Sequence, residues 1–177
     1  GVNNSQARHV FDALTAQDEN QQLGPGLAHS WRVVDDTTWE FSLRPGVAFH
    51  DGTPLSADDI RFTLERAPNV ANSPSSFGTY TKLVTGVSIV DANTIRLHTD
   101  GPSPLLPLDM SQVQVISRKV GEGATTQDYN SGRAMVGTGP YRFVSYVRGD
   151  RLELARFAGH RGPAPAWDKV TFRFITN

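Results

Sequence analysis

The stretch LRPGVAFHDGTPLSADDIRFTLER, from Leu43 to Arg66, contains the most specific local signal in the chain. The dipeptides PG at 45–46 and DG at 51–52 are typical of turns. Between them, Val47 and Phe49 alternate with other residues, as they do in a short strand. The first half of the stretch therefore predicts the end of a strand, a turn, a short strand and a second turn.

The second half of the stretch predicts a helix over Ala57–Arg66. Ser56 is a favourable N-cap residue, and Asp59 stands three positions later, where the acidic residue of a capping box belongs. Pro68 marks the end of the helix, because proline lacks the amide hydrogen that a helix needs. The apolar stripe of this helix consists of Ile60, Leu64 and Ala67.

Composition places the chain among ordinary globular proteins. It has 177 residues, of which 38% are hydrophobic and 20% charged. This length allows one domain, or two small lobes that share a sheet. The net charge of −1 provides no attraction to nucleic acid or to an anionic membrane. No apolar run reaches the ~18–20 residues that span a bilayer, so we expect no transmembrane segment.

The absence of cysteine excludes a disulfide framework and a thiolate metal site, but it does not distinguish cytoplasm from periplasm.

Alternating apolar residues around short polar turns predict several β-hairpins and a mixed α/β fold (α+β) dominated by antiparallel pairs. A helix is expected over Ser5–Leu14, a stiff connector over Gly101–Pro107 and a polar crossover over Gly121–Arg133. The expected strands are Ser30–Val34, Thr38–Arg44, Val87–Val90, Thr94–Thr99, Val113–Ile116, Tyr141–Val147, Arg151–Phe157 and Val170–Ile175.

Acidic residues near the helix start suggest one enzymatic alternative, a small hydrolase of carbohydrates or peptides that uses Asp51, Asp58 or Asp59 as acid or base. Adjacent helical residues point about 100° apart, so the carboxylates of Asp58 and Asp59 do not face each other. They suit the first turn of a helix, where acidic residues interact favourably with the helix dipole, better than a catalytic pair. His50 beside Asp51 is typical of a surface turn. The other histidines, which show no metal-ligand spacing, are His9, His29, His98 and His160. We therefore expect no catalytic residue, metal or cofactor.

The segment Gly137-Thr138-Gly139-Pro140 resembles a phosphate-binding loop only superficially. It lacks the Lys-Ser/Thr pair of a P-loop and the third glycine of a dinucleotide fingerprint. Pro140 also removes an amide that such a loop would use. We expect the segment to serve backbone geometry where the chain returns from a small lobe to the main sheet.

The aromatic pair Phe77 and Tyr80 surrounds a small Gly-Thr segment after a polar loop. From the residues alone two interpretations stay open, because the rings suit either the core or a ligand site. For the whole chain, an interaction module with an exposed sheet face and no pocket is a further alternative.

Four blocks of the sequence together resemble family 5 extracellular solute-binding proteins, the peptide- and nickel-type receptors of ABC importers. The opening stretch resembles the signature region of that family. The other three blocks, in the same order as in the family, are GPGLAHSW at Gly24–Trp31, VGTGPYRF at Val136–Phe143 and WDKVTFRFI at Trp167–Ile175.

The resemblance implies a binding protein and assigns site residues. In peptide-binding members, an aromatic followed by two small residues and a tyrosine approaches the ligand, which makes Phe77 and Tyr80 ligand-facing. Val2 and Asn3 resemble the strand edge that pairs with a peptide backbone. Relatives often have tyrosine where this chain has Phe77, so one hydroxyl contact to a peptide is absent.

The resemblance also implies the partial architecture of a type II periplasmic binding protein. Residues 1–25 and 136–177 are expected in the main ligand-binding lobe, and residues 26–135 in a small β-rich accessory domain with a crossover. A peptide or other small polar solute would bind between this part and a second lobe, and would then pass to a membrane permease. The expected location is periplasmic or extracytoplasmic, and the intact receptor is compatible with attachment to a membrane.

Overall fold

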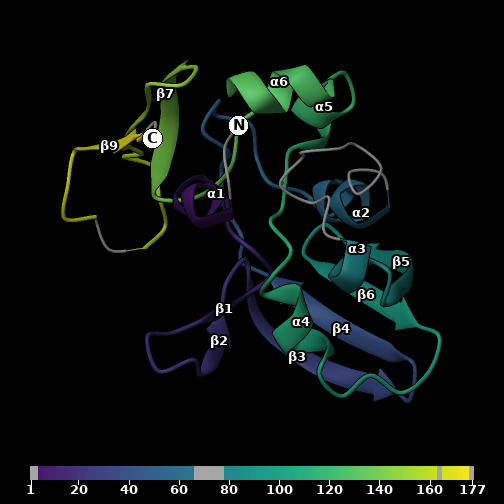
Figure 1. Ribbon diagram of the computed structural model, residues 1–177. Helices are drawn as coiled ribbons and strands as arrows, with labels where there is room; N and C mark the ends of the chain where they lie inside the picture. Colours follow the sequence, from purple (N-terminus) through teal and green to yellow (C-terminus); the bar gives the residue numbers. More distant parts are fainter. Residues whose placement is uncertain (1–3, 66–77, 163–164, 176–177) are drawn as a thin grey trace.

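The computed structural model describes residues 4–65, 78–162 and 165–175 (Figure 1). The helices are α1 (Asn4–Val10), α2 (Ala57–Glu65), α3 (Gly78–Thr81), α4 (Leu106–Met110), α5 (Arg118–Gly121) and α6 (Thr126–Ser131). The strands are β1 (Thr15–Gln17), β2 (Leu23–Pro25), β3 (Ala28–Asp35), β4 (Thr38–Leu43), β5 (Val84–Asp91), β6 (Thr94–Thr99), β7 (Tyr141–Val147), β8 (Arg151–Arg156) and β9 (Lys169–Arg173).

The strands form two main antiparallel sheets and confirm the mixed α/β class. One sheet has the order β3-β4-β6-β5 and the other the order β7-β8-β9, while β1 and β2 pair separately. In Figure 1 the three-stranded sheet lies to the left and the four-stranded sheet at the lower right, with α1 between them. All the predicted hairpins are present, with ends within a few residues of the prediction.

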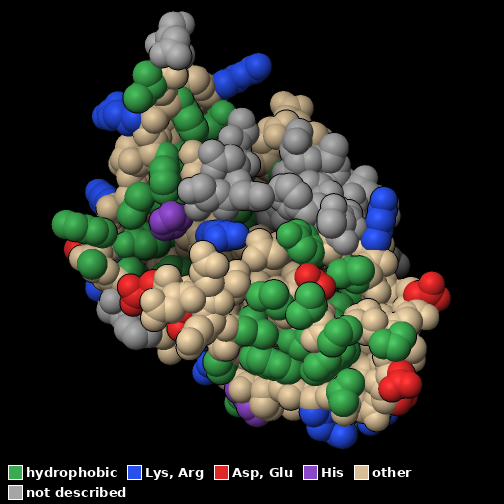
Figure 2. Space-filling view, turned by 60° about the horizontal axis from the view of Figure 1, so that its bottom comes forward, with side chains coloured by type: hydrophobic (Ala, Val, Ile, Leu, Met, Phe, Trp, Pro, Cys, Tyr) green, Lys and Arg blue, Asp and Glu red, His purple; other side chains and the backbone are tan. Residues whose placement is uncertain are grey.

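The four-strand core covers one face of β3-β4-β6-β5. Its fully buried large side chains are Leu27, Phe41, Ile60, Ile95, Leu97, Leu106 and Met110. On the opposite face Glu40 accepts hydrogen bonds from Arg32 (2.9 Å) and Arg96 (3.1 Å), as expected for a sheet with one solvated face. Hydrophobic side chains also gather on one area of the surface (Figure 2). Among the large hydrophobic residues of the described chain, Val33 is 56% and Leu105 63% exposed.

The three-strand core lies between α1 and the sheet β7-β8-β9. Its fully buried large side chains are Phe11, Ile116, Leu152 and Leu154. Helix α2 serves both cores, since Ile60 and Leu64 belong to the four-strand core and Phe62 to the three-strand core. The two cores are therefore distinct but share one helix.

The opening stretch folds as its residues predict. Gly52 has φ of +86°, a left-handed value that suits glycine, and Ala48 forms an isolated antiparallel bridge with Pro54. The Ser56 backbone N–H and hydroxyl donate to Asp59 Oδ2 at 2.8 and 3.2 Å, which caps α2. The predicted helix is confirmed through Glu65, and its last residue, Arg66, lies outside the described residues.

Several other predicted elements were wrong. The first helix ends at Val10 instead of Leu14, and residues 15–17 form β1. Helix α4 occupies part of the predicted connector, and α6, with its own capping box, occupies part of the predicted crossover. The segment Val113–Ile116 is not a strand. Its buried amides find other partners, because Val115 N–H donates to Asp12 O (2.8 Å) and Ile116 N–H to Thr63 Oγ1 (3.0 Å).

Candidate functional site

The predicted ligand contacts fall at the margins of the described chain. Val2, Asn3 and Phe77 lie outside the described residues. Helix α1 begins directly after the first two, and α3 directly after Phe77. Tyr80 is described: it lies in α3, is half-buried and packs against the four-strand core. Its position therefore combines a packing role with partial access to solvent, and its role in ligand binding stays a prediction.

Asp59 has a structural environment rather than a catalytic one. Besides capping α2, it accepts a hydrogen bond from the Arg118 backbone N–H at 2.8 Å through Oδ1. Burial raises the pKa of Asp59, and the hydrogen bonds from Arg118 and Ser56 oppose this rise. Both carboxylate oxygens are engaged, so Asp59 joins the start of α2 to the start of α5.

The other two aspartates of the hydrolase hypothesis do not complete a catalytic pair. Asp58 is half-exposed and lies 3.8 Å from the Arg118 guanidinium. Asp51 is exposed, and its Oδ1 accepts from the Thr53 hydroxyl (2.6 Å) and amide (3.0 Å). Partial burial favours a higher pKa for Asp51, but the hydrogen bonds from Thr53 outweigh it and lower that pKa. A general acid–base pair needs two groups that face one cleft, and Asp51, Asp58 and Asp59 do not form such a pair.

His50 is not the surface residue that the sequence predicted. Its ring is mostly buried and stands edge-on to Phe157, with ring centroids 4.7 Å apart. His50 Nε2–H donates to Gly139 O at 2.9 Å, Gly137 N–H donates to His50 Nδ1 at 3.4 Å, and His50 N–H donates to Gly137 O at 2.9 Å. Burial lowers the pKa of His50, and the hydrogen bond to Gly139 opposes this effect.

The Gly137–Pro140 segment has the backbone role that was expected. A Cβ on Gly137 would collide with the Val10 carbonyl oxygen, and one on Gly139 would lie 2.7 Å from it. Gly139 N–H donates to that same oxygen at 2.8 Å. Glycine is thus required because this turn lies directly against the end of α1.

Asp12 is the centre of a polar cluster that sequence reasoning missed. Its Oδ2 accepts from Thr138 Oγ1 (2.9 Å) and Arg161 Nη1 (2.7 Å), and His160 Nε2 lies 3.9 Å away. Burial lowers the pKa of His160, while Asp12 opposes this effect. Thr138 and Arg161 are 126 and 149 residues from Asp12 in sequence, so no local motif could have signalled the cluster.

The described residues contain neither a group of three or more histidine or acidic side chains suited to a metal ion nor a helix long and apolar enough to cross a membrane.

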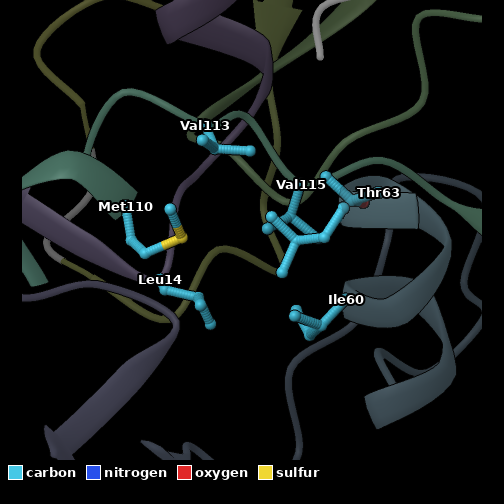
Figure 3. Close-up of a pocket in the computed structure, with 7 residues that line it drawn as sticks. Leu14, Ile60, Thr63, Met110, Val113 and Val115 are labelled. Atoms are coloured by element: carbon cyan, nitrogen blue, oxygen red, sulfur yellow. The ribbon is translucent and has the colours of Figure 1, made fainter. Parts of the chain in front are cut away.

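A small gap in the four-strand core is not a ligand site. Figure 3 shows the side chains around it, which come from the α1–β1 connection, α2, α4 and the segment after α4. The lining residues are Leu14, Ile60, Thr63, Leu64, Met110, Val113 and Val115. The gap has no room for a water molecule, so it is a packing defect of the core.

A comparison with models of known protein families assigns the chain to one of them. Residues 22–177 match the model described as bacterial extracellular solute-binding proteins, family 5 Middle. The chain belongs to this family. The two separate cores, the capped α2 and the Gly137–Pro140 turn are therefore features of a family 5 solute-binding protein.

Curated relatives include two kinds of protein. The glutathione-binding protein GsiB of Pectobacterium atrosepticum is 28% identical over 174 residues, which cover 97% of this chain and 33% of GsiB. The HTH-type transcriptional regulator SgrR of Shigella boydii is 33% identical over 167 residues, which cover 93% of this chain and 28% of SgrR. The chain spans about a third or less of the length of these relatives.

Solved structures confirm the partial binding-protein fold. NikZ from Campylobacter jejuni, in complex with Ni(L-His), superposes with a TM-score of 0.84 at 27% identity, covering 95% of this chain and 34% of NikZ. AppA from Bacillus subtilis, in complex with a nonapeptide, has a TM-score of 0.83 at 20% identity and shows the same fold over 97% of this chain and 35% of its own.

Proposed function

We propose that this chain forms the first lobe and the accessory domain of a solute-binding receptor for an ABC importer. The receptor captures a peptide or another small polar solute between this part and a second lobe, and delivers it to a membrane permease. Its location is periplasmic or extracytoplasmic. The observation that carries the proposal is the match along nearly the whole chain to NikZ and GsiB, whose names and titles record small polar cargoes.

The mechanism is capture by closure, in which the ligand bridges two bodies that move about a hinge. We assign residues 1–25 and 136–177 to the main lobe and residues 26–135 to the accessory domain. Two distinct cores support this division in outline, because most of the four-strand core comes from residues 27–115, while the three-strand core combines α1 with β7 and β8. The backbone hydrogen bond between Val115 and Asp12, where the chain passes from one core to the other, supports a stiff connection.

Within this proposal Val2 and Asn3 offer a strand edge to the ligand backbone, and Phe77 and Tyr80 offer aromatic surface. Phe77→Ala in the complete receptor should weaken ligand binding at least several-fold and leave the melting temperature nearly unchanged. A loss of about 3–5 kcal/mol in stability, as for a buried phenylalanine, would instead assign Phe77 to the core. Leu83→Ala, six positions further along the chain at an exposed residue, is the matched control.

Titration calorimetry tests the proposal as a whole. The complete receptor and the 177-residue chain are titrated with glutathione, with Ni²⁺ plus L-histidine and with short peptides. A micromolar receptor gathers about −8 kcal/mol from its closed cleft, and the loss of one wall removes many contacts and much of the water exclusion. The complete receptor should bind one of these probes, and the chain alone should bind it at least a hundredfold more weakly. Equal affinities would contradict a site between two lobes.

The SgrR relatives favour a second candidate function, a solute-sensing module within a transcriptional regulator. The two candidates share the binding chemistry and differ in location and output. Fractionation of cells that express the complete protein separates them, since a receptor is exported and a regulator stays with the DNA.

A further inference from the structure

The His50 side chain connects two segments that are far apart in sequence. It belongs to the loop before α2, and its ring lies on the turn at residues 137–139. His50 and Gly139 are 89 positions apart in the sequence. The ring donates through Nε2–H to Gly139 O and accepts at Nδ1 from Gly137 N–H. A neutral imidazole with its proton on Nε2 is the one form that makes both bonds, because imidazolium has two donors and no acceptor.

The turn that His50 holds is in direct contact with the end of α1. Gly139 N–H donates to Val10 O, and the two glycines leave no space for side chains between the turn and this carbonyl. Thr138, the residue between them, donates to Asp12. The position of the turn therefore sets how the end of α1 meets the three-stranded sheet.

Charged and titratable groups face the His50 ring from each neighbouring element. Asp12, after α1, favours the protonated ring; His160, after β8, and Arg142, on β7, disfavour it. Arg161 pairs with Asp12 at 2.7 Å and so reduces the effect of that carboxylate. The Phe157 ring covers the imidazole on one side. Burial is the strongest influence, and it keeps the pKa of His50 below its ordinary value.

We propose that His50 is a pH-sensitive clamp, which holds the Gly137–Gly139 turn against α1 while its ring is neutral and releases the turn when the ring takes up a proton. Protonation at Nδ1 would place an N–H opposite the Gly137 N–H and break that hydrogen bond. This inference goes beyond the proposed function and does not depend on any ligand.

The direction of the pH effect follows from linkage. A histidine in the released or unfolded state takes up its proton near pH 6.5, whereas the clamped His50 takes it up only at lower pH. Between these two values the open state binds more protons, so acidification favours opening. The stabilisation by the clamp is complete above about pH 6.5 and is lost as the pH falls from 6.5 towards the lowered pKa of His50.

Amide hydrogen exchange, read by NMR on the 177-residue chain, tests the clamp. The protection factors of the Gly137 and Gly139 amides, corrected for intrinsic exchange rates, are compared at pH 7.5 and pH 5. In the wild type we expect a several-fold loss of protection at pH 5, because the open state then binds a proton that the clamped ring does not. In His50→Gln, which keeps a donor for Gly139 O but cannot titrate, this pH dependence should disappear.

Two matched variants separate His50 from the other histidines. His29→Gln, at an exposed position, should retain the wild-type pH dependence. His160→Gln removes the neighbouring imidazole near Asp12 and should also retain it. If His160→Gln abolishes the effect while His50→Gln keeps it, the switch belongs to His160 and the proposal is overturned.

A wild-type titration keeps the test decisive if His50→Gln does not fold. The ¹³Cε1 shift of His50 and the amide shifts of Gly137 and Gly139 should change with one common midpoint below pH 6.5. Different midpoints for the ring and the turn, or a midpoint at or above 6.5, would overturn the clamp.

Discussion

In the four-stranded sheet, the central strands β4 and β6 bury Phe41, Ile95 and Leu97 completely beneath α2 and α4. In the three-stranded sheet, the central strand β8 likewise buries Leu152 and Leu154, but β9 buries none of its side chains fully. Phe172 and Phe174 remain partly exposed there, and Ile175 is 90% exposed.

This difference shows that a strand can pair fully in a sheet without burying its side chains in a core. Both sheets contain a regular antiparallel ladder, β4-β6 in one and β8-β9 in the other. Yet a phenylalanine contributes to stability in proportion to the apolar surface that it removes from water, and β9 removes little. Residues of the same type in the two regions should therefore contribute differently to the free energy of unfolding. The following substitutions measure this difference.

The largest effect should come from Phe41→Ala, in the middle of β4. Its loss leaves a cavity in the four-strand core and should lower the free energy of unfolding by about 3–5 kcal/mol. Phe172→Ala, on β9, should cost only about 1 kcal/mol, because its ring is partly exposed at the edge of the three-strand core, where it meets His9 edge-on with ring centroids 5.3 Å apart. Urea unfolding measures both values. Equal losses of unfolding free energy would mean that Phe41 and Phe172 are equally important to their cores, which would contradict the comparison.

Asp59→Ala tests the joint between the two regions. It leaves the Ser56 and Arg118 amides without their carboxylate partner in a buried setting and should cost about 2–3 kcal/mol. Asp58→Ala, the adjacent and half-exposed control, should cost less than about 1 kcal/mol. The same unfolding experiment applies, and comparable losses for the two variants would refute the structural role of Asp59.

Gly132→Ala tests how closely α6 meets the three-stranded sheet. Gly132 caps α6 with φ of +86°, and an added Cβ would collide with the Phe143 ring. We expect a loss of about 2 kcal/mol, part from the left-handed backbone and part from displacement of the ring. Gly149→Ala is the control, since its φ is +75° but no atom lies within 4 Å of the added Cβ. A thermal scan should place its melting temperature between those of Gly132→Ala and the wild type.

The smallest effect should come from Trp167→Ser, just before β9. This indole is 71% exposed, so its removal should change the free energy of unfolding by less than about 0.5 kcal/mol. A larger loss in urea unfolding would show that Trp167 covers the open side of the three-strand core, and the contrast between the two regions would narrow.

The sequence determined the features that depend on neighbours a few residues apart. The turn dipeptides at 45–46 and 51–52, the alternation in β4 and β6, and the Ser56–Asp59 cap all act over two to four residues, and all appear in the structure. The four family blocks likewise indicated the family that the comparison then showed. Local backbone preferences and side-chain periodicity are enough for such features, because their partners are already adjacent in the chain.

Only the tertiary structure decided the contacts that join distant segments. His50 meets Gly139 across 89 residues, and Asp12 meets Arg161 across 149. Val113–Ile116 has the apolar pattern of a strand, yet its amides bond to Asp12 and Thr63 instead of to a neighbouring strand. Each of these outcomes depends on which surfaces the packing of two cores brings together. A window of sequence contains no information about a partner that approaches only after the chain has folded.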